Sequence, residues 1–105
     1  MFRFNIKEEH EKTIVHLDGD LDIEATEVIE GELMNDLKNT SGFVELDFKN
    51  IDFVDSSGIG LLITLISFLK DSNRKPTITN INEDVKVVFE LLQLDEILGQ
   101  NVVVV

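Results

Sequence analysis

Cysteine, tryptophan and tyrosine are absent from this chain of 105 residues, which has one proline and two histidines. Without cysteine there is no disulfide, no thiolate metal site and no cysteine nucleophile. His10 and His16 leave little material for a zinc site or a catalytic triad. No stretch reaches the roughly 18 apolar residues of a transmembrane helix, and residues 1–10 lack the apolar centre of a signal peptide. The sequence therefore predicts a cytoplasmic protein.

Basic residues are scarce, because 9 Lys and Arg stand against 21 Asp and Glu, giving a net charge of −12. This charge repels phosphate backbones and anionic lipid surfaces, which argues against nucleic acid or membrane as a partner. Protein partners with basic surfaces are the natural complement. With 43% apolar residues the chain is long enough to bury a core, and we expect one domain over residues 1–105.

Apolar periodicity predicts the element order β-β-α-β-α-β-α-β. Strands are expected at residues 2–6, 13–17, 43–48, 77–81 and at the final valines. A turn at residues 49–50 and a short apolar run at 51–54 should follow the third strand. Helices are expected at about 24–38, at about 58–71, and from Glu83 onward after the cap Asn82. This order is typical of an α/β fold with a mixed, largely parallel sheet of about five strands, crossover helices and an N-terminal hairpin. Function in such sheets collects beyond the carboxyl ends of strands. Here those loops are residues 18–22 and 55–58.

The candidate core follows from the same spacing. The expected inward residues are Ala25, Ile29, Leu33 and Leu37 on the first helix, Val85, Val88, Phe89 and Leu92 on the last helix, and most of the seven phenylalanines.

Two serines stand at the start of the second helix, in the stretch IDFVDSSGIGLLITLISFLK at residues 51–70. One of them is expected to cap the helix, because a serine oxygen accepts a hydrogen bond from a free backbone amide. Neither Ser56 nor Ser57 has a glycine two residues away on both sides, as a nucleophile elbow requires. Gly58 and Gly60 match no phosphate-binding glycine pattern. The stretch therefore favours neither a hydrolase nor a nucleotide site.

The second helix is apolar on most of its faces. Among residues 59–69, only Gly60, Thr64 and Ser67 are not apolar. Such a helix is either enclosed by the domain or keeps an exposed apolar patch for a partner, and the short chain favours the patch. A phosphate on a serine beside this patch would add nearly two negative charges at a helix N-terminus, where the fold accepts them and a partner does not.

Asp18, Asp20 and Asp22 have a spacing that resembles a metal-binding loop. The further ligands of a calcium loop are absent and Gly19 is wrongly placed, so a solvated acidic turn is expected rather than a metal site.

Residues 55–62 (DSSGIGLL), between an apolar strand and an apolar helix, resemble the signature of STAS domains and, more narrowly, of the bacterial anti-sigma-factor antagonists. Residues 19–22 (GDLD) are similar to the family's G-[DE]-[LIVF]-D motif, and the order of elements agrees. The resemblance covers nearly the whole chain.

The resemblance implies a partner switch. Ser56 would be phosphorylated by an anti-sigma factor that is also a serine kinase; the unphosphorylated chain would bind that factor and free the sigma factor, and a serine phosphatase would reset the system. The partner-binding residues implied in this way are Asp20, Asp22, Asp55, Ser56, Ser57, Gly58, Ile59, Gly60 and Leu62, with Ser57 expected as the helix cap. The resemblance also implies no catalytic activity and no cofactor.

Family members usually carry a final helix after the last strand, whereas this sequence stops at Val105. We therefore expect that the final helix is missing or that another chain covers the valine edge, and we expect a monomer. Two alternative functions stay open. The chain could be a STAS scaffold or regulatory module of a non-sigma signalling or transporter complex, or a small nucleotide-binding protein that uses its two loops.

Overall fold

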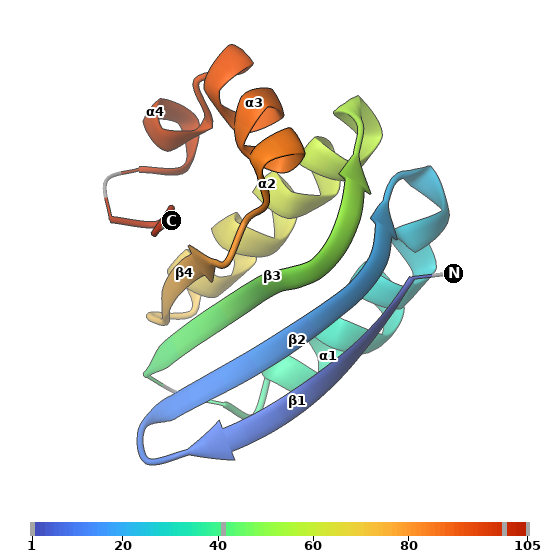
Figure 1. Cartoon of the computed structure of the whole chain (residues 1–105). Coiled ribbons are helices and arrows are strands. Elements are labelled where there is room, and N and C mark those ends of the chain that lie inside the picture. Colours follow the sequence, from blue (N-terminus) through green and yellow to red (C-terminus); the bar gives the residue numbers. More distant parts are fainter. Residues whose placement is uncertain (1, 41, 100, 105) are drawn as a thin grey trace.

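A mixed four-stranded sheet with strand order β1-β2-β3-β4 organises the computed structural model, which describes residues 2–40, 42–99 and 101–104 (Figure 1). The strands are β1 (Arg3–Glu9), β2 (Lys12–Leu21), β3 (Phe43–Val54) and β4 (Lys75–Thr79). The helical elements are η1 (Ile23–Ala25), η2 (Glu27–Leu33), α1 (Met34–Leu37), α2 (Ser56–Asp71), α3 (Glu83–Leu91) and α4 (Leu94–Leu98). β1 and β2 form an antiparallel hairpin, and β3 and β4 run parallel to β2. The predicted α/β class, hairpin and crossovers are confirmed.

Helices cover one face of this sheet, and the face turned toward the viewer in Figure 1 carries none. Strand residues alternate between the two faces. Val44, Leu46 and Phe48 of β3 are fully buried on the covered face. Glu45, between them in sequence, lies on the open face. There it accepts a hydrogen bond from Thr79 of β4 and forms an ion pair with Lys12 of β2. The core therefore lies on one side of the sheet.

β3 is one continuous strand of 12 residues, so the predicted turn at residues 49–50 is wrong. Its pairing with β2 shifts between His16 and Asp18 and again between Gly19 and Asp20, because β3 holds an extra residue at each point. Extra residues of this kind bend a strand without ending it. Figure 1 shows the resulting curve of β3.

The predicted helix at residues 24–38 is helical from 23 to 37 but has an unusual pitch. Within it the backbone N–H of Met34 donates to the carbonyl of Ile29, five residues earlier. Four residues overshoot an ordinary helical turn by about 40°. A turn closed over five residues is wider than an ordinary turn and offsets this overshoot. Side chains spaced by four residues therefore stay on the same face of the helix. The row Ala25, Ile29, Leu33 and Leu37 is buried, as predicted.

The C-terminal region departs most from the prediction. α4 was not expected, and Gln93, with φ of 52°, separates it from α3. The fifth strand is reduced to a parallel bridge between Val103 and Ile78, so the sheet has four full strands. Asn82 caps α3 as predicted, and Val85 and Phe89 are buried, but Leu92 is 44% exposed.

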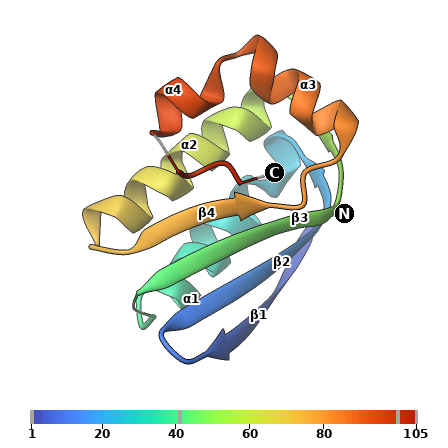
Figure 2. The ribbon, with the colours of Figure 1, turned by 60° about the vertical axis from the view of Figure 1, so that its left-hand side comes forward.

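α2 is enclosed by the domain, so the expected apolar patch on its surface is wrong. Six of its eight large apolar residues, Ile59, Leu61, Leu62, Leu65, Ile66 and Leu69, are buried, and the other two, Ile63 and Phe68, are half-buried. α2 contacts the sheet, the helical segment from η1 to η2, and α4 (Figure 2). The unpredicted α4 supplies the cover that the short chain was not expected to provide. Between its first turn and its last two residues, the exposed residues of α2 are Gly60, Thr64 and Ser67.

None of the helices in the described residues combines the length and the apolar composition needed to cross a bilayer.

The enclosure of α2 predicts unequal costs for two substitutions on the same helix. Leu65→Ala should lower the free energy of unfolding by about 2–5 kcal/mol, because it leaves a cavity in the core. Ser67→Ala, on the exposed stripe, should change it by less than about 0.5 kcal/mol. Urea unfolding measures both, and equal small effects would contradict the enclosed position of α2.

Candidate functional site

The two predicted loops meet at one edge of the sheet, where the parallel strands β2 and β3 end side by side. Leu21 lies opposite Val54, and Asp20 lies opposite Phe53. β2 extends as far as Leu21, so most of the loop predicted at residues 18–22 is strand. The backbone N–H of Asp55 donates to the Leu21 carbonyl across 3.3 Å and ties the two strand ends together.

Aspartates, and not serines, cap the two helical segments that leave this edge. A carboxylate oxygen of Asp55 accepts a hydrogen bond from the N–H of Gly58 at 2.9 Å, and Asp22 accepts one from Glu24 at 3.0 Å. Asp55 has the extended backbone of an N-cap residue, and its negative charge is favourable at a helix N-terminus. The expectation that Ser57 caps α2 is therefore wrong.

Ser56 and Ser57 are the first two residues of α2, and both are exposed. Because Asp55 supplies the cap, neither hydroxyl is needed for the helix to begin. Free backbone N–H groups and the helix dipole favour an anion at this position. A modified serine in the first turn is therefore compatible with the fold.

Gly58 is required by the packing of α2 against the end of β2. A Cβ atom at this position would lie 1.7 Å from the backbone oxygen of Leu21. Gly60, two residues later, has no heavy atom within 4 Å of such a Cβ and faces solvent. The two glycines of the motif therefore have different roles.

The predicted partner-binding residues fall into two groups. Asp20, Ser56, Ser57 and Gly60 are exposed, and Asp22 and Asp55 are half-buried. Gly58, Ile59 and Leu62 are buried. The buried three cannot touch a partner in this fold; they hold the first turns of α2 in place.

Apolar surface near Ser56 comes from two residues that the sequence did not single out. Ile23, directly after Asp22, is 65% exposed, and Phe53, two residues before Asp55, is 51% exposed. Phe53 also lines a groove of about 300 Å³ between the end of β3 and the start of α3; its walls are Asp52, Phe53, Val54, Asp84, Val85 and Val88. Phe53 is thus one of the phenylalanines that lie outside the core, where most of the seven were expected. We call Ile23, Phe53 and this groove the apolar rim.

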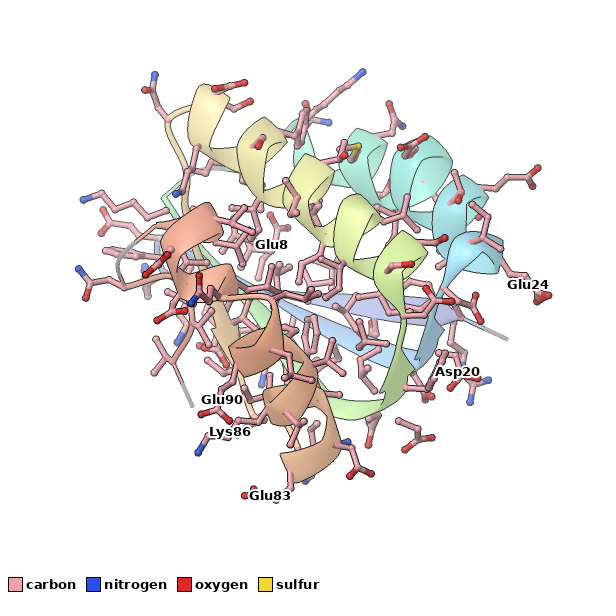
Figure 3. The ribbon with its side chains drawn as sticks, turned by 90° about the horizontal axis from the view of Figure 1, so that it is seen from above. Glu8, Asp20, Glu24, Glu83, Lys86 and Glu90 are labelled. Atoms are coloured by element: carbon pink, nitrogen blue, oxygen red, sulfur yellow. The ribbon has the colours of Figure 1, made fainter. Side chains whose placement is uncertain are left out.

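Acidic side chains surround the apolar rim. Figure 3 shows Asp20 and Glu24 on the same side of the molecule, with Glu24 pointing outward. Asp52 and Asp84 line the groove itself. An apolar contact surface bordered by carboxylates fits a partner whose own surface is apolar and basic.

A separate polar cluster on the open face of the sheet was missed by the sequence analysis. Asp47 is buried and accepts hydrogen bonds from His16 Nδ1 at 2.8 Å, Asn80 Nδ2 at 2.9 Å and the Lys49 N–H at 3.0 Å. Burial alone would raise the pKa of Asp47, but the hydrogen bonds from Asn80, Lys49 and His16 together lower it. Residues of β2, of β3 and directly after β4 meet here, and no sequence spacing indicates it.

This cluster joins an imidazole to a carboxylate without the third member of a triad. In the described residues no serine or threonine hydroxyl is hydrogen-bonded to His16. Nor does any group of three or more histidine, aspartate or glutamate side chains in the described part of the chain have the arrangement of a metal site.

Comparison with known proteins places this arrangement in a family. A family model of the STAS domain matches residues 3–103. The anti-sigma factor antagonist SpoIIAA in its unphosphorylated form is 22% identical, with a TM-score of 0.63 and coverage of 92% of this chain and 99% of that one. The phosphorylated form of SpoIIAA, from Bacillus, is also 22% identical, with a TM-score of 0.65 and coverage of 97% and 89%.

Two other solved structures have a similar fold. An anti-sigma factor antagonist from Mycobacterium paratuberculosis is 14% identical, with a TM-score of 0.78 and coverage of 91% of this chain and 81% of that one. A sulfate transporter family protein from Wolinella succinogenes is 13% identical, with a TM-score of 0.77 and coverage of 90% and 77%. Similarity at these identities establishes the fold and leaves the function to the site.

The two motif glycines provide a matched test of the packing. Gly58→Ala should lower the free energy of unfolding by at least about 2 kcal/mol, because its methyl group collides with the Leu21 backbone. Gly60→Ala should stabilise α2 by up to about 1 kcal/mol, since alanine is the better helix former and the space is open. Thermal and urea unfolding measure both, and a tolerated Gly58→Ala would refute the close approach.

The lowered pKa of Asp47 predicts a loss of stability in acid. The folded pKa lies below the unfolded value of about 3.9, so the ionised carboxylate stabilises the fold above roughly pH 4 and the gain is lost as pH falls through the folded pKa. Urea unfolding at a series of pH values between about 7 and about 2 measures how steeply the free energy of unfolding falls with pH. Asp47→Asn should reduce this slope, and Asn80→Ala should move the loss to higher pH by removing one donor. An unchanged slope in Asp47→Asn would refute the assignment.

Proposed function

The chain belongs to the STAS domain family, and on that basis we propose that it is an anti-sigma-factor antagonist controlled by phosphorylation of Ser56. One observation carries the proposal. Ser56 is an exposed hydroxyl in the first turn of α2, and the cap of that helix is Asp55. A phosphate can therefore be added to Ser56 and removed again while the helix keeps its start.

In the unphosphorylated state the apolar rim is the contact surface. Ile23, directly after Asp22, and Phe53, two residues before Asp55, supply exposed apolar area. The acidic border selects a partner with basic residues around an apolar patch. We propose that this partner is an anti-sigma factor with serine kinase activity, and that its capture frees a sigma factor in the cytoplasm.

Phosphorylation then ends the interaction. The γ-phosphoryl group passes from the partner's ATP to Ser56 Oγ; the bond to ADP breaks, the Oγ–P bond forms, and the hydroxyl proton passes to a base on the kinase. The product carries nearly two further negative charges beside Asp22 and Asp55. The helix N-terminus compensates them within the fold, whereas a partner must desolvate them at the interface. A serine phosphatase reverses the step by hydrolysis.

In this scheme the chain is the substrate of a kinase and has no catalytic activity of its own. Its His16–Asp47 pair lies on the open face of the sheet, in the middle of β2 and β3, several residues before the strand ends that adjoin Ser56. We assign that pair to stability.

A second candidate is a regulatory STAS module of a transporter or of another signalling complex. It is supported by the TM-score of 0.77 with the sulfate transporter family protein, which is close to the 0.78 with the antagonist from Mycobacterium paratuberculosis, so fold similarity alone does not separate the two candidates. The identity of the bound partner separates this candidate from the first.

Phosphorylation at Ser56 can be measured by intact mass after incubation with ATP and extract of the source organism. The wild type and Ser57→Ala should each gain one phosphate, and Ser56→Ala should gain none. Ser57→Ala is the matched control because both serines are exposed neighbours in one helical turn. Phosphate on Ser56→Ala would exclude Ser56 as the site.

Ser56→Asp should weaken binding to the anti-sigma factor at least tenfold, which corresponds to about 1.4 kcal/mol. Its free energy of unfolding should stay within about 1 kcal/mol of the wild type, because the site is exposed. Calorimetry with purified anti-sigma factors of the source organism measures binding. A sizing column measures separately whether this binding releases the sigma factor. Binding without release of a sigma factor would favour the second candidate.

A further inference from the structure

A cavity lies at the end of the sheet opposite to Ser56, where β3 and β4 begin and α2 ends. Its volume is about 420 Å³, and its walls include Phe43, Lys70, Arg74, Lys75, Pro76 and Val102. Cavities that bind small molecules typically have volumes of about 300–1,000 Å³. Neither the STAS signature at residues 55–62 nor the apolar rim contributes to it.

Positive charge collects in this cavity although the chain as a whole is acidic. Three of the 9 basic residues, Lys70, Arg74 and Lys75, line it, and the net charge of the chain is −12. None of the ion pairs in the described residues includes any of the three. The nearest acid along the chain, Asp71, is exposed on the last turn of α2. The three charges therefore lack a carboxylate counterion among the described residues.

Arg74 is the most unusual of the three because it is 8% exposed. Its Nε donates to the Thr40 carbonyl at 3.0 Å and its Nη2 to the Lys38 carbonyl at 2.8 Å. The guanidinium also lies 5.7 Å from the centre of the Phe68 ring. Its third nitrogen, Nη1, is buried without a hydrogen-bond partner in the described structure. A buried cation with a free donor and no counterion is costly, and such a group indicates a missing ion or water.

The two lysines leave donors available at the same cavity. Lys70 Nζ donates one hydrogen bond to the Leu98 carbonyl, and an ammonium group has three donors. Lys75 Nζ lies 5.4 Å from the centre of the Phe43 ring, which is itself half exposed. Phe43, Pro76 and Val102 add apolar wall beside these charges.

We propose that this cavity binds a small anion that carries a phosphoryl group. Two ammonium groups and the Arg74 guanidinium match the charge and the several acceptor oxygens of such a group. The apolar wall leaves room for a carbon-bearing portion of the same molecule. Inorganic phosphate and a small phosphate ester share this chemistry, and the experiment below separates them.

The test is an NMR titration of the ¹⁵N-labelled chain at constant ionic strength with inorganic phosphate, pyrophosphate and glycerol 3-phosphate. At least one probe should cause saturable shifts confined to the amides around Lys70, Lys75, Gly99 and Asn101. Tighter binding of the ester identifies a phosphorylated metabolite, and binding of inorganic phosphate alone identifies free phosphate. Shifts that fail to saturate with all three probes, or that spread equally to Lys49 and Lys86, would overturn the proposal.

Charge-matched variants separate a built site from general attraction. Lys70→Gln and Lys75→Gln should each weaken binding at least fivefold; both lysines are exposed, so the variants should fold. Lys49→Gln removes the same charge from an exposed lysine of β3 that forms no ion pair in the described residues, and it should bind like the wild type. Equal losses in Lys49→Gln and Lys75→Gln would overturn the proposal.

This inference is independent of the proposed switch. Ser56→Ala should bind the same probe with unchanged affinity, because Ser56 and Lys70 lie at opposite ends of α2. A negative result in the phosphorylation experiment would not contradict this anion site, and a negative titration would not contradict the partner switch.

Discussion

The structure depends on the close contact between the first turn of α2 and the last residue of β2. Only glycine at position 58 lets the helix approach the Leu21 carbonyl, since any Cβ would overlap that oxygen. The same carbonyl accepts the N–H of Asp55, whose side chain then caps the helix. Helix position, helix start and the pairing of two strand ends are therefore fixed together. Ser56 is exposed because this contact sets the rotation of α2.

The STAS signature consequently combines two kinds of residue in one helical turn. Gly58 and Ile59 face the interior and hold α2 against the sheet, whereas Ser56 and Gly60 face solvent. A surface built in this way can change charge without changing the packing beneath it. In the proposed switch the apolar area for a partner would come mainly from outside α2, where Ile23 and Phe53 are exposed near the ends of the neighbouring strands.

The sequence was sufficient for the hairpin, the crossovers, the Asn82 cap and the buried row from Ala25 to Leu37, because each depends on local spacing. It could not choose between aspartate and serine at the cap of α2, since both are favoured there. The enclosure of α2 depends on α4, a helix of five residues whose two buried leucines give no periodic signal. Asp47 and Arg74 were missed because all but one of their hydrogen-bond partners lie more than 30 residues away in sequence.

The helix dipole of α2 favours a negative charge at its N-terminus and a positive charge at its C-terminus, and the sequence places both. Asp55 caps its N-terminus, and Lys70 lies in its last turn with Arg74 just beyond it; the exposed Asp71 is the one acid at that end of the helix. The N-terminus carries the positive end of the dipole, so it tolerates the added charge of a phosphoserine better than an ordinary surface would. In the proposed switch a partner would gain no such compensation and would meet the phosphate together with Asp22 and Asp55. Under that proposal the same charge would be acceptable to the fold and repulsive to the complex, which is the physical requirement for a reversible switch.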